Sequence, residues 1–254
     1  MITPQRLGRT VATIPLTPPA PAVREALQPC VARGVVSADF RTFDPLRSYH
    51  CHVGYLDRLR PHRGTGRLLE IGCGIGLLSH AAALDGWEVA GIEPSEPLAA
   101  FARLNLGLDV RIGSAAAVPC DPATFDAVVL IDTDRLLPAL PEVVRQVARV
   151  LRPGGAFLVS APNPDGLARR LDDGHEESGP SWSLLAALAA VGLEPLDVDY
   201  GGSSVADVVR AHEADRDASL RIAALLERSR DWRTLAERLE VLARRADDPA
   251  PTPS

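Results

Sequence analysis

The chain of 254 residues contains no lysine, so its 27 basic residues are all arginine, and they are outnumbered by 33 acidic residues. The formal net charge of −6 and the isoelectric point near 5.5 argue against the broad basic surface that nucleic-acid-binding proteins need. A protein that acts on DNA or rRNA is therefore disfavoured. We attribute the absence of lysine to codon bias, since alanine, leucine and proline are abundant.

Two further absences limit the cellular setting. No apolar run is long enough to span a bilayer, and the N-terminus lacks the basic-then-apolar pattern of a signal peptide. The four cysteines are scattered, with no C-x-x-C pair that would suggest zinc. We therefore expect a cytoplasmic protein without membrane association. An apolar content of 46% is enough for one domain with a substantial core.

The most informative stretch is residues 67–96, which predicts a strand, a tight glycine turn, a helix and a second strand. The apolar run at 68–71 leads directly into Gly72-Cys73-Gly74-Ile75-Gly76, and the strand predicted at 87–93 ends on Glu93. Since glycine lacks a Cβ, the backbone at Gly72 and Gly74 can adopt positive φ and a ligand can approach it closely. This order is typical of half of a nucleotide-binding α/β sheet.

Two acids and the glycine spacing indicate which nucleoside is bound. Dinucleotide-binding turns have the spacing G-x-G-x-x-G and place a helix N-terminus against a pyrophosphate. Here the spacing is G-x-G-x-G, and Glu70, two residues before the first glycine, would repel a pyrophosphate. That acid suits a ligand with an ammonium group and a sulfonium, and S-adenosylmethionine (SAM) has both. Glu93 can accept hydrogen bonds from two ribose hydroxyls.

The run Glu70–Gly76 (E-I-G-C-G-I-G) resembles motif I of the class I SAM-dependent methyltransferases, in particular the quinone and secondary-metabolite O-methyltransferase group. Three further stretches resemble the family in the expected order: Gly113-Ser114-Ala115 with Val118-Pro119, Phe125–Val129, and Leu151–Gly155. The resemblance covers roughly residues 67–165. It implies a Rossmann-like α/β fold with a seven-stranded, mostly parallel sheet whose last strand is antiparallel, helices on both faces and an N-terminal helical lid.

The resemblance also implies which residues contact SAM and its product S-adenosylhomocysteine (SAH). Near the methionine moiety it places Glu70, at the amino group, and the main chain of Gly72, Cys73 and Gly74. For Glu70 the alternative is an acid that only caps backbone amides. Glu93 would bind the ribose, or be an ordinary surface acid.

Four other positions complete the implied cofactor site. Near the adenine the resemblance places Ser114 and Ala115, although Ala115 could equally be a plain helix-starting residue. Asp132, at the end of the fourth strand, would line the methionine or acceptor side, or cap the following helix. Tyr49 would lie near SAM from the lid, or belong to the core.

Methyl transfer from SAM requires alignment of acceptor, methyl and sulfur, and a base only where the acceptor loses a proton. The candidate bases are His175, in a charged loop, and His50, in the predicted lid; a solvated loop histidine is the alternative for His175. Many relatives have a Glu-His pair after the fourth strand. This chain has Arg135 and Leu136 there, so that histidine is absent.

A His-Cys-His triplet at His50, Cys51 and His52 invites a metal site. Residues i and i+2 of a helix point to different faces and cannot share an ion, so we expect no metal.

Hydrophobic periodicity predicts the remaining organisation. We expect a flexible arm at 1–22, a helical lid at 23–62 with helices at 23–31 and 45–59, a SAM-binding domain at 63–246 and a disordered tail at 247–254. Within the domain we predict strands at 68–72, 87–93, 109–113, 126–132, 155–161 and 193–200, and helices at 76–85, 96–105, 140–151 and 182–191. The helical spacing of charged and apolar residues at 206–230 predicts one or two surface helices. Residues 238–244 fit a helix end or a seventh strand, and the strand is favoured.

The leading hypothesis is a SAM-dependent methyltransferase acting on oxygen or nitrogen of a small molecule, such as a specialised metabolite, as a monomer or homodimer. The absent Glu-His pair motivates an alternative, a protein of this fold that binds SAM or SAH without methyl transfer. A third hypothesis is methylation of a protein or a carrier-bound substrate, which the arm and the C-terminal helices suggest.

Overall fold

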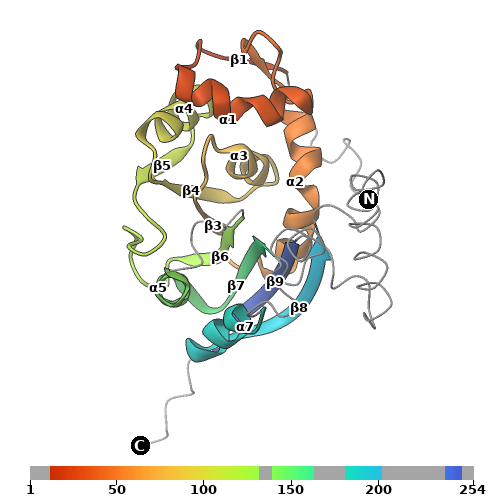
Figure 1. The fold of residues 1–254 in the computed structure, drawn as a ribbon. Coiled ribbons are helices and arrows are strands. Elements are labelled where there is room, and N and C mark those ends of the chain that lie inside the picture. Colours follow the sequence, from red (N-terminus) through yellow and green to blue (C-terminus); the bar gives the residue numbers. More distant parts are fainter. Residues whose placement is uncertain (1–11, 132–138, 163–180, 202–237, 248–254) are drawn as a thin grey trace, which may run out of the picture. The chain divides into compact units, whose positions relative to one another are not determined.

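The computed structural model describes residues 12–131, 139–162, 181–201 and 238–247 (Figure 1). The chain divides into two compact units. The first contains the residues up to Val129 together with Arg149–Ala156, and the second contains Leu130–Ala148 and the chain from Phe157 onward.

The first unit begins with short N-terminal elements and continues as alternating strands and helices. These are β1 (Ile14–Pro15), α1 (Pro21–Ala32), β2 (Thr42–Phe43), α2 (Pro45–Leu59), the 3-10 turn η2 (Arg60–His62), β3 (Arg67–Ile71), α3 (Leu77–Leu84), β4 (Glu88–Glu93), α4 (Glu96–Leu106), β5 (Asp109–Ile112) and β6 (Phe125–Leu130). They are followed by α5 (Leu140–Val150), β7 (Leu151–Pro162), α7 (Ser181–Ala190), β8 (Leu193–Gly201) and β9 (Arg238–Arg245). The predicted strands and helices of 67–201 agree with these bounds to within a few residues.

The sheet has the predicted topology. Hydrogen-bonded neighbours follow the order β5-β4-β3-β6-β7-β9-β8 in a seven-stranded sheet. Within the first unit β3 is parallel to β4 and to β6, and β4 is parallel to β5. Parallel neighbours joined by the crossover helices α3 and α4 place the carboxyl ends of these strands at one edge, where open α/β sheets bind ligands.

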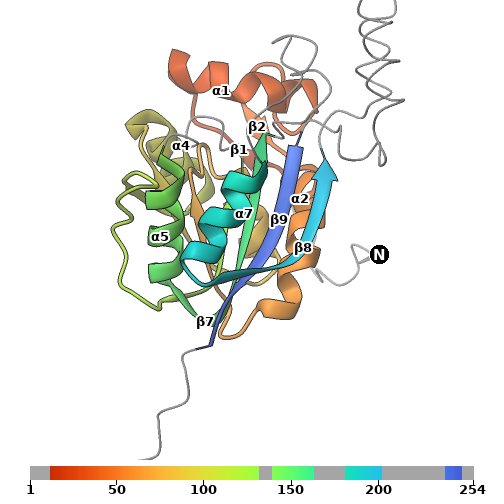
Figure 2. The same cartoon turned by 60° about the horizontal axis from the view of Figure 1, so that its bottom comes forward.

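In the second unit β9 is a strand, as favoured from the sequence, and it is antiparallel to β8 (Figure 2). Its buried residues include Leu239, Val241 and Ala243, which alternate along the strand as a half-buried strand requires. The Arg238 guanidinium donates hydrogen bonds to the Ser160 hydroxyl and carbonyl of β7, at 2.8 and 2.9 Å. The predicted helices of 206–230 and the tail from 248 lie outside the described residues.

The N-terminal elements pack on the rest of the first unit through a hydrophobic cluster. Its buried residues are Leu16, Val23, Leu27, Cys30, Val35, Val36, Phe43, Ile75 and Phe101. Within the predicted flexible arm, residues 12–22 thus have structure: the Thr17 amide donates to the Asn105 side chain of α4 at 2.8 Å. Because Ile75 belongs to the glycine turn, the cluster joins this N-terminal segment to the ligand edge of the sheet.

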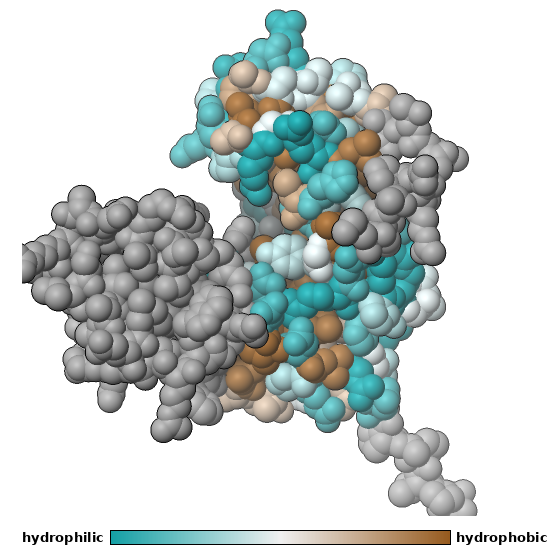
Figure 3. Space-filling view, turned by 90° about the vertical axis from the view of Figure 1, so that its right-hand side faces the viewer, coloured by the Kyte–Doolittle hydropathy of each residue, from teal (hydrophilic) through white to brown (hydrophobic). Residues whose placement is uncertain are grey.

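Hydrophobic side chains are also exposed. They include Leu104 on α4, Ile112 on β5, and Leu196 and Val198 on β8, which are 38 to 79% exposed. The face shown in Figure 3 carries hydrophobic patches among hydrophilic residues. None of the helices in the described ranges combines the length and the apolar character needed to cross a bilayer.

Candidate cofactor site

The glycine turn after β3 is open on one side. All three glycines have positive φ, at 74° for Gly72, 55° for Gly74 and 82° for Gly76. A Cβ added at Gly72 or Gly74 would meet no atom within 4 Å, whereas at Gly76 it would lie 2.4 Å from Leu108 Cδ1. The first two glycines therefore border space that a ligand could fill, and the third permits close packing.

The backbone donors of this turn are committed within the protein. The Gly72 and Cys73 amides donate to the Ile92 carbonyl at 2.7 and 3.1 Å. The Gly74 amide donates to Glu93 Oε2 at 2.8 Å. A phosphate-binding turn needs such donors for its ligand. This turn instead holds these donors internally and has two buried acids, Glu70 and Glu93, beside it, and carboxylates are acceptors that suit a cationic group.

Glu93 ties the ends of two strands together. Its carboxylate is buried, and Oε1 accepts a hydrogen bond from the Ser95 amide, at the start of α4, at 2.9 Å. The Gly113 amide donates to the Glu93 carbonyl at 3.4 Å, which brings the turn with Ser114 and Ala115 beside it. Ser114 is exposed and Ala115 is buried.

Glu70 lies beneath the glycine turn and is only 6% exposed. Its Oε2 accepts a hydrogen bond of 2.5 Å from the hydroxyl of Ser79, in the first turn of α3. Burial raises the pKa of Glu70 to about 7, although the hydroxyl and amide of Ser79 favour the ionised form, and the nearby Glu93 raises it further. The capping role that the sequence left open for Glu70 is therefore present, since it accepts from a first-turn residue of a helix without a side-chain cap.

Cys73 fills the space between the glycine turn and β4. Its thiol is buried, and burial with the nearby charges of Glu70 and Glu93 raises its pKa far above the usual range. A thiol that stays protonated is a poor nucleophile and metal ligand. A Cβ added at Gly91 would lie 2.7 Å from Cys73 Sγ and 3.1 Å from Val110 Cγ2. The turn and β4 therefore fit together only because residue 91 has no side chain.

This fit predicts the effect of Gly91→Ala. The added methyl group should lower the free energy of unfolding by about 1–3 kcal/mol, the usual cost of overpacking a core. Cys73→Gly in the same chain should recover part of that loss, because it removes the closest clashing atom. A double-mutant cycle of urea unfolding measures the coupling. Equal losses for Gly91→Ala in both backgrounds would contradict the proposed clash.

The Tyr49 hydroxyl lies at the end of α3 that is far from the glycine turn. Tyr49 is buried, its hydroxyl donates to Asp85 at 3.1 Å, and it accepts from Arg60 at 2.7 Å. Asp85 ends α3, roughly 12 Å along the helix from the turn. Tyr49 is thus a core residue that fastens α2 to the far end of α3, which is the core position that the sequence left open for it. His50 is exposed, with its ring against that of Tyr49.

The other predicted positions are placed as follows. The structure brings together Glu70, the glycine turn, Glu93 and the turn with Ser114. The residues outside the described ranges are Asp132, Arg135, Leu136 and His175. Ser79 was missed, and the only sign of it is one hydroxyl within the apolar helix 77–84. Among the described residues, no three histidine, cysteine or acidic side chains are grouped as metal ligands.

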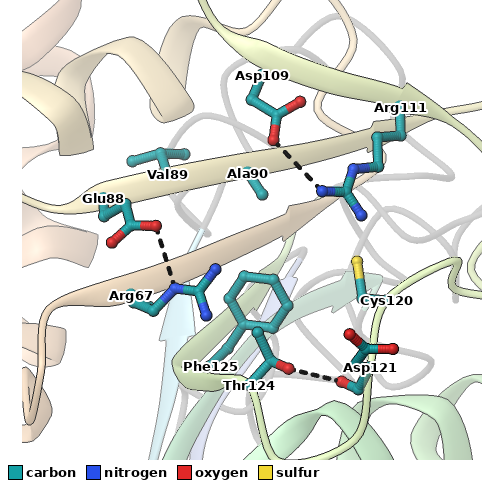
Figure 4. A pocket seen from close by; sticks show the side chains of 10 residues that line it. All are labelled: Arg67, Glu88, Val89, Ala90, Asp109, Arg111, Cys120, Asp121, Thr124 and Phe125. Atoms are coloured by element: carbon teal, nitrogen blue, oxygen red, sulfur yellow. Dashed lines mark hydrogen bonds and ion pairs between the residues drawn. The ribbon is translucent and has the colours of Figure 1, made fainter.

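A polar cavity of about 160 Å³ lies at the opposite edge of the first unit (Figure 4). Its lining includes the first residues of β3, β4, β5 and β6: Arg67, Glu88, Asp109 and Phe125. Two ion pairs border it, Arg67 with Glu88 at 3.2 Å and Arg111 with Asp109 at 3.7 Å. Because these are the amino ends of the strands, the cavity is separate from the glycine turn.

Comparison with known proteins gives a consistent picture. A family profile described as a methyltransferase domain matches residues 69–159. The chain is 32% identical over 174 residues to a probable S-adenosylmethionine-dependent methyltransferase of Mycolicibacterium smegmatis, which covers 61% of this chain and 68% of that protein. It is 31% identical over 172 residues to nocamycin O-methyltransferase of Saccharothrix syringae, covering 61% of each.

Other matches are shorter or more distant. The chain spans about half the length of two ubiquinone biosynthesis O-methyltransferases that it matches, 50% for that of Azoarcus and 47% for that of Xylella fastidiosa. Among solved structures it resembles the [4+2]-cyclase SpnF, with a TM-score of 0.52 and 21% identity over 77% of this chain and 82% of that one. This last likeness concerns the fold alone.

Proposed function

This chain belongs to the class I SAM-dependent methyltransferases, and we propose that it is a cytoplasmic enzyme that transfers the methyl group of SAM to oxygen or nitrogen of a small molecule. The observation that carries the proposal is the glycine turn: Gly72 and Gly74 border open space, three amides of the turn are committed within the protein, and two buried acids, Glu70 and Glu93, lie at the ends of β3 and β4. A cationic ligand is what such a site can bind. The acidic chain and the similarity to nocamycin O-methyltransferase support a small, specialised acceptor.

The residues present fit the family's cofactor. We assign Glu70 and the carbonyls of the glycine turn to its ammonium group, Glu93 to its ribose, and Ser114 and Ala115 to its adenine. When bound, SAM supplies a methyl group already activated by its sulfonium, so the protein's main task is to orient the reactants and exclude water.

The lid and the base are further parts of the proposal. Residues 23–62 would cover the site, a role that the packing of Phe43 and Leu27 with Ile75 of the turn supports. Asp132 would line the acceptor side, and His175 would accept a proton from an acceptor that loses one. The exposed position of His50 makes it the weaker candidate.

An alternative keeps the cofactor but not methyl transfer. One observation favours it: arginine and leucine stand in place of the Glu-His pair at 135–136. Because one fold can carry several chemistries, cofactor binding alone does not decide between the two. Transfer of labelled methyl from SAM to a panel of phenols, amines and carboxylic acids separates them. SAH binding without any transfer would favour the alternative.

Titration calorimetry with SAH tests the cofactor site directly. We expect Glu93→Ala to weaken SAH binding by about 1–3 kcal/mol, because it removes the charge-assisted acceptor of two hydroxyls. Glu88→Ala is the matched control: it removes an exposed acid from the amino end of the same strand and should leave the affinity unchanged. Failure of the parent to bind SAH at millimolar concentration would refute the proposal.

A further inference from the structure

The partner of Glu70 in the described site is a buried serine. The Ser79 side chain is 1% exposed, and its hydroxyl lies 2.5 Å from Glu70 Oε2. The titratable group that acts on Glu70 from a neighbouring element is Glu93, at the end of β4; the Cys73 thiol, in the turn, is near Glu70 and stays protonated. Neither supplies a positive charge, so in the described site Ser79 is the side chain that favours an ionised Glu70.

The charge of Glu70 matters for a cationic ligand. A carboxylic acid, uncharged and with its own proton to donate, is a poor partner for an ammonium group, whereas a carboxylate accepts a charge-assisted hydrogen bond. Burial beside a second acid disfavours the ionised form. A hydroxyl that donates to one carboxylate oxygen opposes this and also fixes the plane of the group.

We infer that Ser79 is a positioning residue for cofactor binding: through its hydrogen bond it holds Glu70 ionised and oriented toward the ammonium group of the ligand. The inference rests on the proposed function, because it concerns the same site. It assigns a role to a residue that does not itself touch the ligand.

The test is SAH affinity as a function of pH between 6 and 9 for three proteins. In the parent the affinity should rise as Glu70 ionises. In Ser79→Ala the midpoint of that rise should move up by about one pH unit, the worth of one hydrogen bond to a charged group. The affinity should therefore fall about fivefold near pH 7 and recover at pH 9. Titration of the ligand's own amino group is the same for all three proteins and cancels from the comparison.

Ser48→Ala is the matched control. Ser48 is a fully buried serine of α2 in the same unit, and its hydroxyl bonds to the Leu77 carbonyl at 3.5 Å instead of to an acid. The midpoint of the rise in SAH affinity with pH should be the same in Ser48→Ala as in the parent. If Ser79→Ala does not fold, Ser79→Cys, a weaker donor of similar size, should move the midpoint less and in the same direction.

Three results are distinguishable. An upward midpoint shift confined to the Ser79 variants supports the inference. The same loss of affinity at every pH, or no loss at all, would overturn it and leave Ser79 a packing residue. A parent that binds no SAH at any pH would refute the proposed function itself.

Discussion

Glu70→Gln is expected to stabilise the cofactor-free protein at pH 8 and at the same time to weaken SAH binding at least tenfold. Glutamine keeps the shape of the side chain and an oxygen that can accept the Ser79 hydrogen bond. It removes the charge that is costly to bury. It also removes the charge that an ammonium ligand needs, so stability and binding should move in opposite directions.

The size of the stability gain in Glu70→Gln, and its dependence on pH, follow from the pKa of Glu70. Burial raises that pKa from 4.5 to about 7 in the folded protein. The stability from a carboxyl with a raised pKa is fully present below its unfolded pKa and is lost as the pH rises through the folded pKa. The parent should therefore lose on the order of 3 kcal/mol between acidic pH and pH 8, and the variant should keep it.

Urea unfolding of the two cofactor-free proteins at pH 5 and pH 8 measures this. The difference in free energy of unfolding between Glu70→Gln and the parent should grow by roughly 2 kcal/mol from pH 5 to pH 8. Glu88→Gln, at the exposed end of the neighbouring strand, should show no such change. A variant that is less stable than the parent at pH 8 would mean that capping of α3 by the carboxylate outweighs the cost of its burial.

The opposed effects of the Glu70 charge on stability and on ligand binding explain why residue 70 is an acid. A stable fold would prefer a neutral residue beneath the turn, and Ser79, which donates to the acid, only partly offsets the cost. Sites that conflict with stability in this way are where function is usually found.

Local patterns predicted most of the fold. The glycine turn and the following acid lie within 24 residues, and the alternation of Leu239, Val241 and Ala243 was enough to favour a strand for β9. Glu70 and Glu93 were predicted as a pair for the same reason: each ends a strand, and parallel strands bring such ends together.

Contacts between distant residues were not predictable. Helical spacing places Tyr49 on a buried face, but whether it faces the ligand edge or the opposite edge depends on Asp85, 36 residues away. The sequence left both a cofactor contact and a core position open for Tyr49, and in the structure it is buried in the core. Ser79 escaped because one hydroxyl in an apolar helix has no partner until the fold supplies Glu70.

Asp126→Asn is expected to lower the free energy of unfolding by about 2–4 kcal/mol, the largest loss of stability that we predict. Its carboxylate is buried, with a side chain 8% exposed. It accepts hydrogen bonds from Thr65 Oγ1 at 2.7 Å, from the Arg67 amide at 2.9 Å and from Arg152 at 2.9 Å. Asparagine would turn one acceptor oxygen into a donor facing these donors.

These contacts also explain two of the motifs. Asp126 belongs to the stretch Phe125–Val129, and Arg152 belongs to the stretch Leu151–Gly155. Both stretches resemble the family, but the sequence alone gave no chemical role for their residues. The ion pair between them fastens the amino end of β6 to the start of β7. Asp126 and Arg152 therefore have a structural role at the amino ends of these strands.

The stability that Asp126 contributes changes with pH in the opposite direction to the stability that Glu70 contributes. Burial alone would raise the pKa of Asp126, but the hydrogen bonds from Arg67, Thr65 and Arg152 outweigh it and hold the pKa below its usual value. The stability from a lowered pKa is present above the unfolded pKa and is lost as the pH falls through the folded pKa. Parent and Asp126→Asn should differ fully at pH 7 and converge in strong acid.

Urea unfolding at pH 7 and in acid, with exposed Asp121→Asn as the control, measures the difference. A loss below 1 kcal/mol at pH 7 would show that the three contacts contribute little net stability. The folded fraction of Asp126→Asn should still bind SAH with the parent's affinity, because its carboxylate lies at the amino ends of the strands. Asp126→Asn should lose stability and keep its affinity for SAH, whereas Glu70→Gln should gain stability and lose affinity. These two results would separate the edge of the sheet that stabilises the fold from the edge that binds the cofactor.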